Sequence, residues 1–331
     1  MKRKRLSIDV YLKGILERDT VILSQAITLI ESTKPEDEKL ATELMSRLPS
    51  PVADQLCFKI GITGVPGVGK STFIDTFGMH LLSLGLKIAV LSVDPSSQRT
   101  RGSILGDKTR MEKLSLENDA YIRPSPSGST LGGVAHKTHE SIVLCEAAGF
   151  DCIIVETVGV GQSETMVRDM VDFFLLLMLA GGGDELQGIK RGIMEMADMI
   201  VIHKADGDNI KAAKKARVSY QNALHLFPPH PNGWIPPVQL CSSLENTGVA
   251  EIQETIDRYK GQTIANGFLY QNRITQSKKW FENLLQHRLL QKLYRSPSLG
   301  DEIRQTEKKV VEGEMNVPSA VGQFVGKIKT S

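Results

Sequence analysis

The sequence predicts an α/β fold in which a mostly parallel sheet is flanked by helices. Two observations predict it. From residue 57 to about residue 260, short apolar runs alternate with segments of helical periodicity, and a glycine-rich loop joins the first of these runs to a helix. In such sheets the ligand lies beyond the carboxyl ends of the strands, so functional residues should directly follow the strands.

The glycine-rich loop satisfies the pattern G-x-x-x-x-G-K-[ST] and lies between an expected strand at Phe58–Thr63 and an expected helix at Thr72–Leu84. The glycines let backbone amides and the helix N-terminus face phosphate, Lys70 should reach the β- and γ-phosphates, and the Ser71 hydroxyl should ligate Mg²⁺. A glycine-rich turn with a chance lysine is the alternative, which the full pattern in this context disfavours. The motif predicts a P-loop NTPase, in which the phosphate-binding residues would be Gly64, Val65, Pro66, Gly67, Val68, Gly69, Lys70, Ser71 and Thr72.

Composition is that of an ordinary globular protein, with 331 residues, 41% hydrophobic residues, 24% charged residues and a net charge of +2. The charge gives no reason to expect nucleic acid or an anionic membrane as a partner. The longest apolar run, Phe173–Ala180, is too short to span a bilayer. The four cysteines stand singly in or beside apolar segments and no C-x-x-C occurs, which favours free thiols in a cytoplasmic protein.

We divide the chain into a helical segment at 1–56, a nucleotide domain at 57–260 and a helical arm with a tail at 261–331. The first segment has the periodicity of two or three amphipathic helices, and the arm contains a long helical pattern at Gln271–Tyr294, followed by a helix at Asp301–Val311. The arm could be a dimerisation element or a cap on the same molecule. Within the nucleotide domain, helices include Ala135–Ala148 and Lys211–Leu224; the other expected strands are Lys87–Val93, Ala120–Arg123, Asp151–Glu156, Phe173–Leu179, Met199–His203 and Val238–Cys241.

Acidic residues follow two of the strands, where carboxylates can hold Mg²⁺ directly or through water. Asp94 ends the second strand, although a turn aspartate before proline is the alternative, and Glu156 ends the strand at 151–156. Glycine follows Glu156 three residues later, as in a Walker B and switch II segment, although ordinary GTPases have Asp in place of this Glu. Gln162 is a candidate for orienting water, with a structural role after the glycine-rich turn as the alternative. Lys70, Asp94, Glu156 and Gln162 are the candidate catalytic residues.

The run His203-Lys204-Ala205-Asp206 is close to the N-K-x-D motif with which GTPases read guanine. Asp206 can accept hydrogen bonds from guanine N1–H and N2–H₂, donors that adenine does not present there. Lys204 would cover the base, while His203 departs from the Asn that ties this loop to the phosphate loop. Ser242, Ser243 and Leu244 follow the last strand where GTPases usually have S-A-L, whose backbone contacts the base carbonyl.

Another glycine-rich segment, Gly181–Gly192, follows the apolar strand at Phe173–Leu179 and contains closely spaced acidic and basic residues. None of its residues belongs to a phosphate or base motif. A plain flexible loop is the alternative, but its glycines and charges suit a segment that changes partners with nucleotide state.

Six runs together closely resemble the MeaB/ArgK family of GTPases associated with methylmalonyl-CoA mutase, once labelled lysine/arginine/ornithine transport ATPases. They are TGVPGVGKST, SVDPSSQRTRGSILGDKTRM, RPSPSGSTLGGVAHKTHE, ETVGVGQSE, AGGGDELQGIKRGIMEMAD and KADGDN. The resemblance covers about residues 10 to 290. It implies a homodimeric SIMIBI-class GTPase that serves as chaperone to an adenosylcobalamin-dependent acyl-CoA mutase, gating cofactor loading and protecting the enzyme from inactivation.

The resemblance also implies roles for individual residues. Asp94, Asp107 and Glu156 match the family's acidic residues around Mg²⁺, so Glu in switch II is expected. Gly181–Gly192 matches the segment through which the family communicates with its mutase, and His203 departs from the family's Asn.

Two alternatives come from other classes. A metal-insertion GTPase of the same fold usually carries a Cys- or His-rich site, and this chain has no such cluster in its sequence. An ATPase or kinase serving amino-acid transport is disfavoured by Asp206 and by the lack of a membrane segment.

Overall fold

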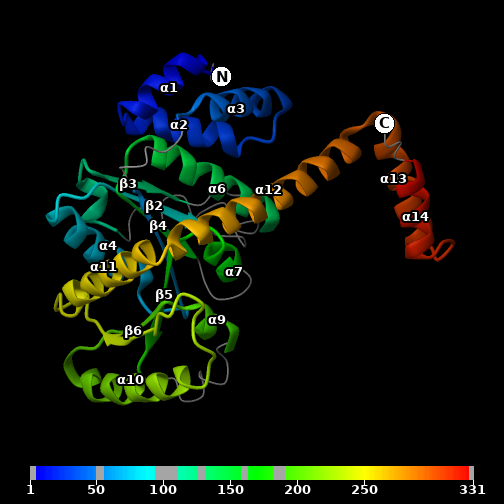
Figure 1. Ribbon diagram of the computed structural model, residues 1–331. Coiled ribbons are helices and arrows are strands. Elements are labelled where there is room, and N and C mark those ends of the chain that lie inside the picture. The colour runs from blue at the N-terminus through cyan, green and yellow to red at the C-terminus, as the bar shows by residue number, and fades with distance from the viewer. Residues whose placement is uncertain are drawn as a thin grey trace. The chain divides into compact units, whose positions relative to one another are not determined.

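The computed structural model describes residues 5–49, 56–93, 111–124, 131–157, 163–181 and 191–327 (Figure 1). Its contacts divide the chain into two compact units, Met1–Ile274 and Thr275–Ser331. Among the described residues, no helix is both long and apolar enough to cross a membrane.

The first unit is built on a parallel sheet with strand order β3-β2-β4-β1-β5-β6-β7, which confirms the predicted α/β class. Nearly every strand residue is buried, because helices cover both faces, and this is why the strands appear in the sequence as continuous apolar runs. The strands are β1 (Phe58–Gly64), β2 (Ile88–Val93), β3 (Ala120–Arg123), β4 (Cys152–Thr157), β5 (Phe173–Leu179), β6 (Met199–His203) and β7 (Val238–Leu240).

Alternate residues of β1 identify the helices on each face of the sheet. Phe58 and Ile60 line a small cavity with residues of α4 (Lys70–Ser83) and α11 (Val249–Ala265). Lys59, on the opposite face, forms an ion pair of 2.8 Å with Glu146 of α6 (Leu131–Ala147). The other helical elements between the strands of the sheet are η3 (Leu114–Leu116), α7 (Ser163–Arg168), α9 (Arg191–Met196), η4 (Gly207–Asn209) and α10 (Ile210–Leu224).

Three helices precede the sheet, and α2 packs on α6. They are α1 (Ile8–Leu16), α2 (Thr20–Glu31) and α3 (Pro35–Arg47). The Asp19 carboxylate caps α2 by accepting hydrogen bonds from the amides of Val21 and Ile22, at 2.9 and 3.0 Å. Buried Asp37 joins α3 to the start of the chain, since it accepts two hydrogen bonds from the Arg5 guanidinium.

The boundary between the two units falls inside α12 (Phe268–Arg295), which is followed by α13 (Pro297–Val311) and α14 (Val317–Lys327). The α14 helix lies where the sequence analysis expects only a tail. Its glycines and Pro318 conceal a helical pattern, yet a proline in the first turn of a helix loses no intrahelical hydrogen bond.

Candidate nucleotide-binding site

The phosphate loop connects β1, in the centre of the sheet, to the N-terminus of α4. Gly69 is the residue before the helix and has a φ of 90°, a left-handed conformation that glycine adopts without steric cost. A β-carbon on Gly64 would lie 2.4 Å from the Leu177 carbonyl oxygen of β5, so this position accepts only glycine without a shift of the backbone. The helix N-terminus, with its free amides, therefore lies beside the loop where phosphate is expected.

Lys70 is the first residue of α4 and its ammonium group donates a hydrogen bond to the Gly64 carbonyl, at 3.0 Å. Burial lowers the pKa of Lys70 below its ordinary value, while the nearby carboxylates of Glu156 and Glu164 act in the opposite direction. Both carboxylates are almost fully buried and Lys70 is half-buried, so the amine is held in a partly desolvated, acidic environment. In that position it can place a positive charge next to phosphate oxygens.

Glu156 lies at the end of β4, beside β1, and only 5% of its surface is exposed. The Ser71 hydroxyl donates to its Oε1 at 3.3 Å. A hydroxyl and a carboxylate oxygen at this spacing, next to a phosphate loop, are the ligand types that Mg²⁺ prefers, so the residues fit the expected ion. The other residues expected near the metal or the attacking water, Asp94, Asp107 and Gln162, lie outside the described residues.

The residues predicted to read the base lie at or just after the ends of two neighbouring strands, β6 and β7, which end at the same edge of the sheet. The Ser242 hydroxyl, which follows β7, donates to Oδ2 of Asp206 and accepts a hydrogen bond from the Glu245 amide at 3.1 Å. Two backbone hydrogen bonds between Ser242 and Thr247 close the loop at 3.0 Å each. The side chain of Leu244 points to solvent, so any contact it makes with a base would come from its backbone.

Lys204 and His203 both reach back from β6 to the phosphate loop. The Lys204 ammonium donates to the Gly67 carbonyl at 2.8 Å. The His203 imidazole contacts the Val68 carbonyl through Nδ1 at 2.6 Å and the Ser243 hydroxyl through Nε2 at 2.7 Å. The two halves of the predicted site therefore lie together, and His203 makes the connection for which GTPases use Asn.

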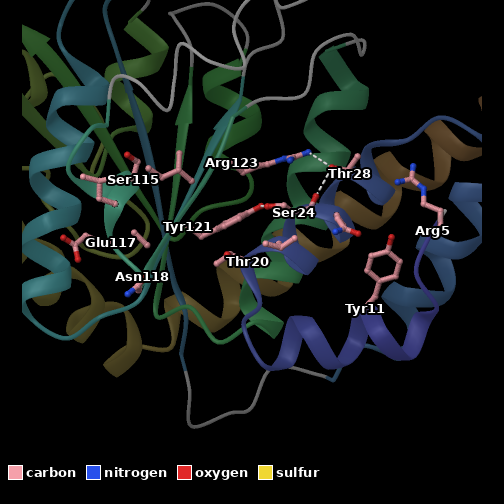
Figure 2. Close-up of a pocket in the computed structure, with 15 residues that line it drawn as sticks. Arg5, Tyr11, Thr20, Ser24, Thr28, Ser115, Glu117, Asn118, Tyr121 and Arg123 are labelled. Carbon is pink, nitrogen blue, oxygen red and sulfur yellow. Dashed lines mark hydrogen bonds between the residues drawn. The ribbon is translucent and has the colours of Figure 1, made fainter. Parts of the chain in front are cut away.

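A separate polar cavity of about 880 Å³ lies on the sheet edge formed by β3, far along the strand order from β6 and β7 (Figure 2). Residues of α2 and β3 face each other across it, and the Ser24 and Tyr121 hydroxyls are 3.1 Å apart. It contains none of the residues predicted from the sequence motifs.

Comparison with known proteins identifies the family. The family profile described as "Methylmalonyl Co-A mutase-associated GTPase MeaB" matches residues 23–298. The chain is 44% identical over 319 residues to "GTPase ArgK" of Escherichia coli, covering 96% of each chain. It is 45% identical over 317 residues to "Methylmalonic aciduria type A homolog, mitochondrial" of Mus musculus, covering 93% of this chain and 76% of the relative.

A solved structure described as "LAO/AO transport system kinase" superposes with a TM-score of 0.75, at 37% identity and 98% coverage of both chains. Fold, sequence and motif order thus agree. The chain belongs to the methylmalonyl Co-A mutase-associated GTPase MeaB family, and it is a P-loop GTPase that binds GTP and GDP.

Proposed function

We propose that this GTPase is a chaperone of an adenosylcobalamin-dependent acyl-CoA mutase of the methylmalonyl-CoA mutase type. In this role its nucleotide state gates cofactor loading and protects the mutase from inactivation. The observation that carries the proposal is the match to a mutase-associated family over residues 23–298. The mouse relative, whose name refers to methylmalonic aciduria, supports the same assignment.

Within the site, we assign phosphate binding to residues 64–72 and Mg²⁺ binding to Ser71 and Glu156, together with Asp94 and Asp107. Mg²⁺ would neutralise charge on the phosphate oxygens during hydrolysis. The partly buried Lys70 ammonium supports this assignment, because a charge removed in part from water interacts more strongly with phosphate than a fully solvated one. Gln162 remains our candidate for orienting the attacking water.

Asp206 is assigned to the guanine N1–H and N2–H₂ groups, with Lys204 against the base and residues 242–244 at its carbonyl. The contact between the Ser242 hydroxyl and Asp206 supports this, since it orients the carboxylate and leaves acceptor sites on both oxygens for the base. Such a site disfavours ATP, and therefore also the alternative of an ATPase or kinase serving amino-acid transport.

Among the described residues no group of three or more His, Cys, Asp or Glu could hold a metal ion, so the described part of the chain gives no support to metal insertion.

We further propose a homodimer formed through the C-terminal arm and a cytoplasmic location. Apolar side chains on α12 support the first proposal, because Phe281, Leu285 and Leu289 recur at a spacing of four residues and are 65%, 46% and 53% exposed. The four buried free cysteines are consistent with a reducing compartment.

The test of the chaperone role is reconstitution with an adenosylcobalamin-dependent methylmalonyl-CoA mutase. GTP hydrolysis should be slow alone, on the order of 10⁻⁴ to 10⁻² per second, and should accelerate when the mutase is added. Lys70→Ala should abolish hydrolysis in both conditions and weaken triphosphate binding. A rate that does not respond to the mutase, in a preparation that binds GTP normally, would refute the chaperone role but not the GTPase assignment.

The segment Gly181–Gly192, most of which lies outside the described residues, is the proposed route of communication with the mutase. Replacing Lys190 with Ala should reduce mutase-stimulated hydrolysis more than basal hydrolysis. An equal proportional loss of both rates would instead assign this segment to the catalytic site.

A further inference from the structure

His203 occupies a position from which one side chain touches both halves of the nucleotide site. Only 3% of its surface is exposed. Its two ring nitrogens have different partners, the Val68 carbonyl in the phosphate loop and the Ser243 hydroxyl after β7. The partners belong to segments far apart in the sequence, and this one imidazole contacts both of them.

The chemistry of the partners fixes the direction of both hydrogen bonds. A carbonyl oxygen can only accept, so Nδ1 carries the hydrogen and donates it to Val68. In the neutral ring Nε2 is then an acceptor, and the Ser243 hydroxyl donates to it. Burial lowers the pKa of His203 and Lys204 lowers it further, against the opposing effects of the Val68 carbonyl and Asp206, so the ring is neutral at physiological pH.

Packing holds the ring in this orientation. Phe73 of α4 meets it edge to face, with ring centroids 5.8 Å apart. A β-carbon on Gly69 would lie 3.2 Å from two atoms of the imidazole, so the phosphate loop approaches the ring closely because residue 69 is glycine. The imidazole is therefore restrained by packing as well as by its two hydrogen bonds.

We propose that His203 and Ser243 form a matched positioning pair, which holds the loop at residues 242–244 in register with the phosphate loop and thereby sets affinity for the guanine half of the nucleotide. The inference rests on the proposed assignment of Asp206 and residues 242–244 to the base. In this proposal the departure of His203 from the Asn of other GTPases gives the site a second contact that Asn could not make. An Asn amide can reach the Val68 carbonyl from the position of Nδ1, but it has no atom at the position of Nε2.

Two substitutions of His203 test the two contacts separately, one with a shorter amide side chain and one with a longer one. His203→Asn places a nitrogen near Nδ1, so it should keep the bond to Val68 and lose the bond to Ser243. His203→Gln places a nitrogen near Nε2, so it should keep the contact with Ser243 and lose the one with Val68. Ser243→Ala removes the hydroxyl and leaves the ring in place, and the double variant His203→Asn with Ser243→Ala completes a cycle.

The experiment measures dissociation constants of the full-length variants for Mg²⁺-GDP and for Mg²⁺-tripolyphosphate, which has no base. His203→Asn and Ser243→Ala should each weaken GDP binding about five- to tenfold, the effect of one buried hydrogen bond, and the double variant should be no weaker than either. Tripolyphosphate should bind these three variants as it binds the wild type. His203→Gln should weaken the binding of both ligands, because the phosphate loop loses its hydrogen bond from residue 203 to the Val68 carbonyl.

Three results would overturn the proposal. They are multiplicative losses of GDP affinity in the double variant, an unchanged GDP affinity in Ser243→Ala, and an equal loss of tripolyphosphate affinity in Ser243→Ala. If the substitutions of His203 fail to fold, Ser243→Ala alone still decides, because a single hydroxyl is removed from a half-buried side chain. Asp206→Asn is the reference variant. If it also leaves GDP affinity unchanged, the assignment of Asp206 to the base is itself wrong. If Asp206→Asn weakens GDP binding and Ser243→Ala does not, only the proposed pair of His203 and Ser243 is refuted.

Discussion

Asp206 depends on a residue of another strand for its orientation. Its carboxylate is half-buried three residues beyond the end of β6 and accepts a hydrogen bond from fully buried Ser242, which follows β7. A carboxylate held in this way has acceptor sites left on both oxygens, which can accept from two neighbouring donors on one base. The geometry leads to a prediction about nucleotide choice.

Asp206→Asn should weaken GTP binding and improve XTP binding, by about 2–3 kcal/mol in differential affinity if the contact with the base is buried. Xanthine has a carbonyl where guanine has N2–H₂, so an amide suits it better than a carboxylate. Titration with GTP, ATP and XTP measures the change. Asp208→Asn, two residues away at an exposed position, is the matched control and should change none of the three affinities.

Most of the site could be predicted at this scale because its motifs are contiguous. The phosphate loop and residues 203–206 each lie within one short run of sequence, so the spacing within each run and the order of the runs are enough to predict their roles. The contact between His203 and Ser243 could not be predicted, because it depends on the rotamer of the imidazole and on the register in which β7 pairs with β6. A histidine in place of Asn and a serine in place of Ala were visible separately, but nothing in the sequence paired them.

The elements before the sheet are held together by a buried charge. Asp37 of α3 accepts hydrogen bonds from Arg5 at 2.9 and 2.6 Å and from the Ser32 hydroxyl at 2.6 Å. The Arg5 guanidinium, followed by the Ser32 hydroxyl, lowers the pKa of Asp37 to about 2 against the opposing effect of burial. Folding is therefore linked to the ionisation of this carboxyl group.

Asp37→Asn should lower the free energy of unfolding by about 1–2 kcal/mol at pH 7, a figure reduced for the partial exposure of Arg5. Because the pKa is lower in the folded state, the stabilisation is complete above about pH 4 and disappears as the pH falls towards 2. Urea unfolding of wild type and variant from pH 7 to pH 2.5 should show the two curves converging at acid pH. Asp9→Asn, which breaks an exposed ion pair with Arg47, should change stability little at any pH.

A second buried carboxylate fixes the start of α12 to the sheet. Asp172 is fully buried before β5 and accepts hydrogen bonds from Arg273 at 2.8 and 2.6 Å and from the Lys59 amide at 2.8 Å. Arg273 also donates to the Cys57 carbonyl at 2.6 Å, so one guanidinium joins the beginnings of β1 and β5 to the helix.

Arg273→Ala should lower the free energy of unfolding by about 3 kcal/mol or more, because it leaves a buried carboxylate without its cation. Lys278→Ala, on the same helix but exposed, is the control and should cost less than about 0.5 kcal/mol. Chemical denaturation monitored by circular dichroism gives both values. Equal effects of the two substitutions would mean that Asp172 finds another partner.

The elements differ in how well their sequence predicts them. All seven strands were located, since a strand buried on both faces is a short apolar run between polar turns. The α14 helix was missed because Pro318, Gly322 and Gly326 are typical of loops, whereas its valines and Phe324 share one side only when the segment is helical. The short helices α7 and α9 contain too few residues for a periodicity to appear.

At the scale of the whole molecule, the proposed homodimer depends on the apolar residues of α12 described above. Replacing Phe281 and Leu285 together with Asp should produce a monomer, because two charges would have to be buried in the interface. Sedimentation velocity at several protein concentrations measures the state. Glu282→Ala, which changes an exposed polar residue on the same helix, should leave the dimer intact, and a dimer that persists in the double variant would require another interface.

The place of β1 between β4 and β5 has a consequence for folding of the protein during its synthesis on the ribosome. The strand that begins the phosphate loop is synthesised early, but both of its neighbours, and the Leu177 carbonyl against which Gly64 lies, come much later in the chain. At a translation speed of about 5–20 residues per second, this wait is on the order of ten seconds. During that time the loop has no sheet to support it, so the nucleotide cannot guide the early folding of the nascent chain and can stabilise it only after β5 has emerged.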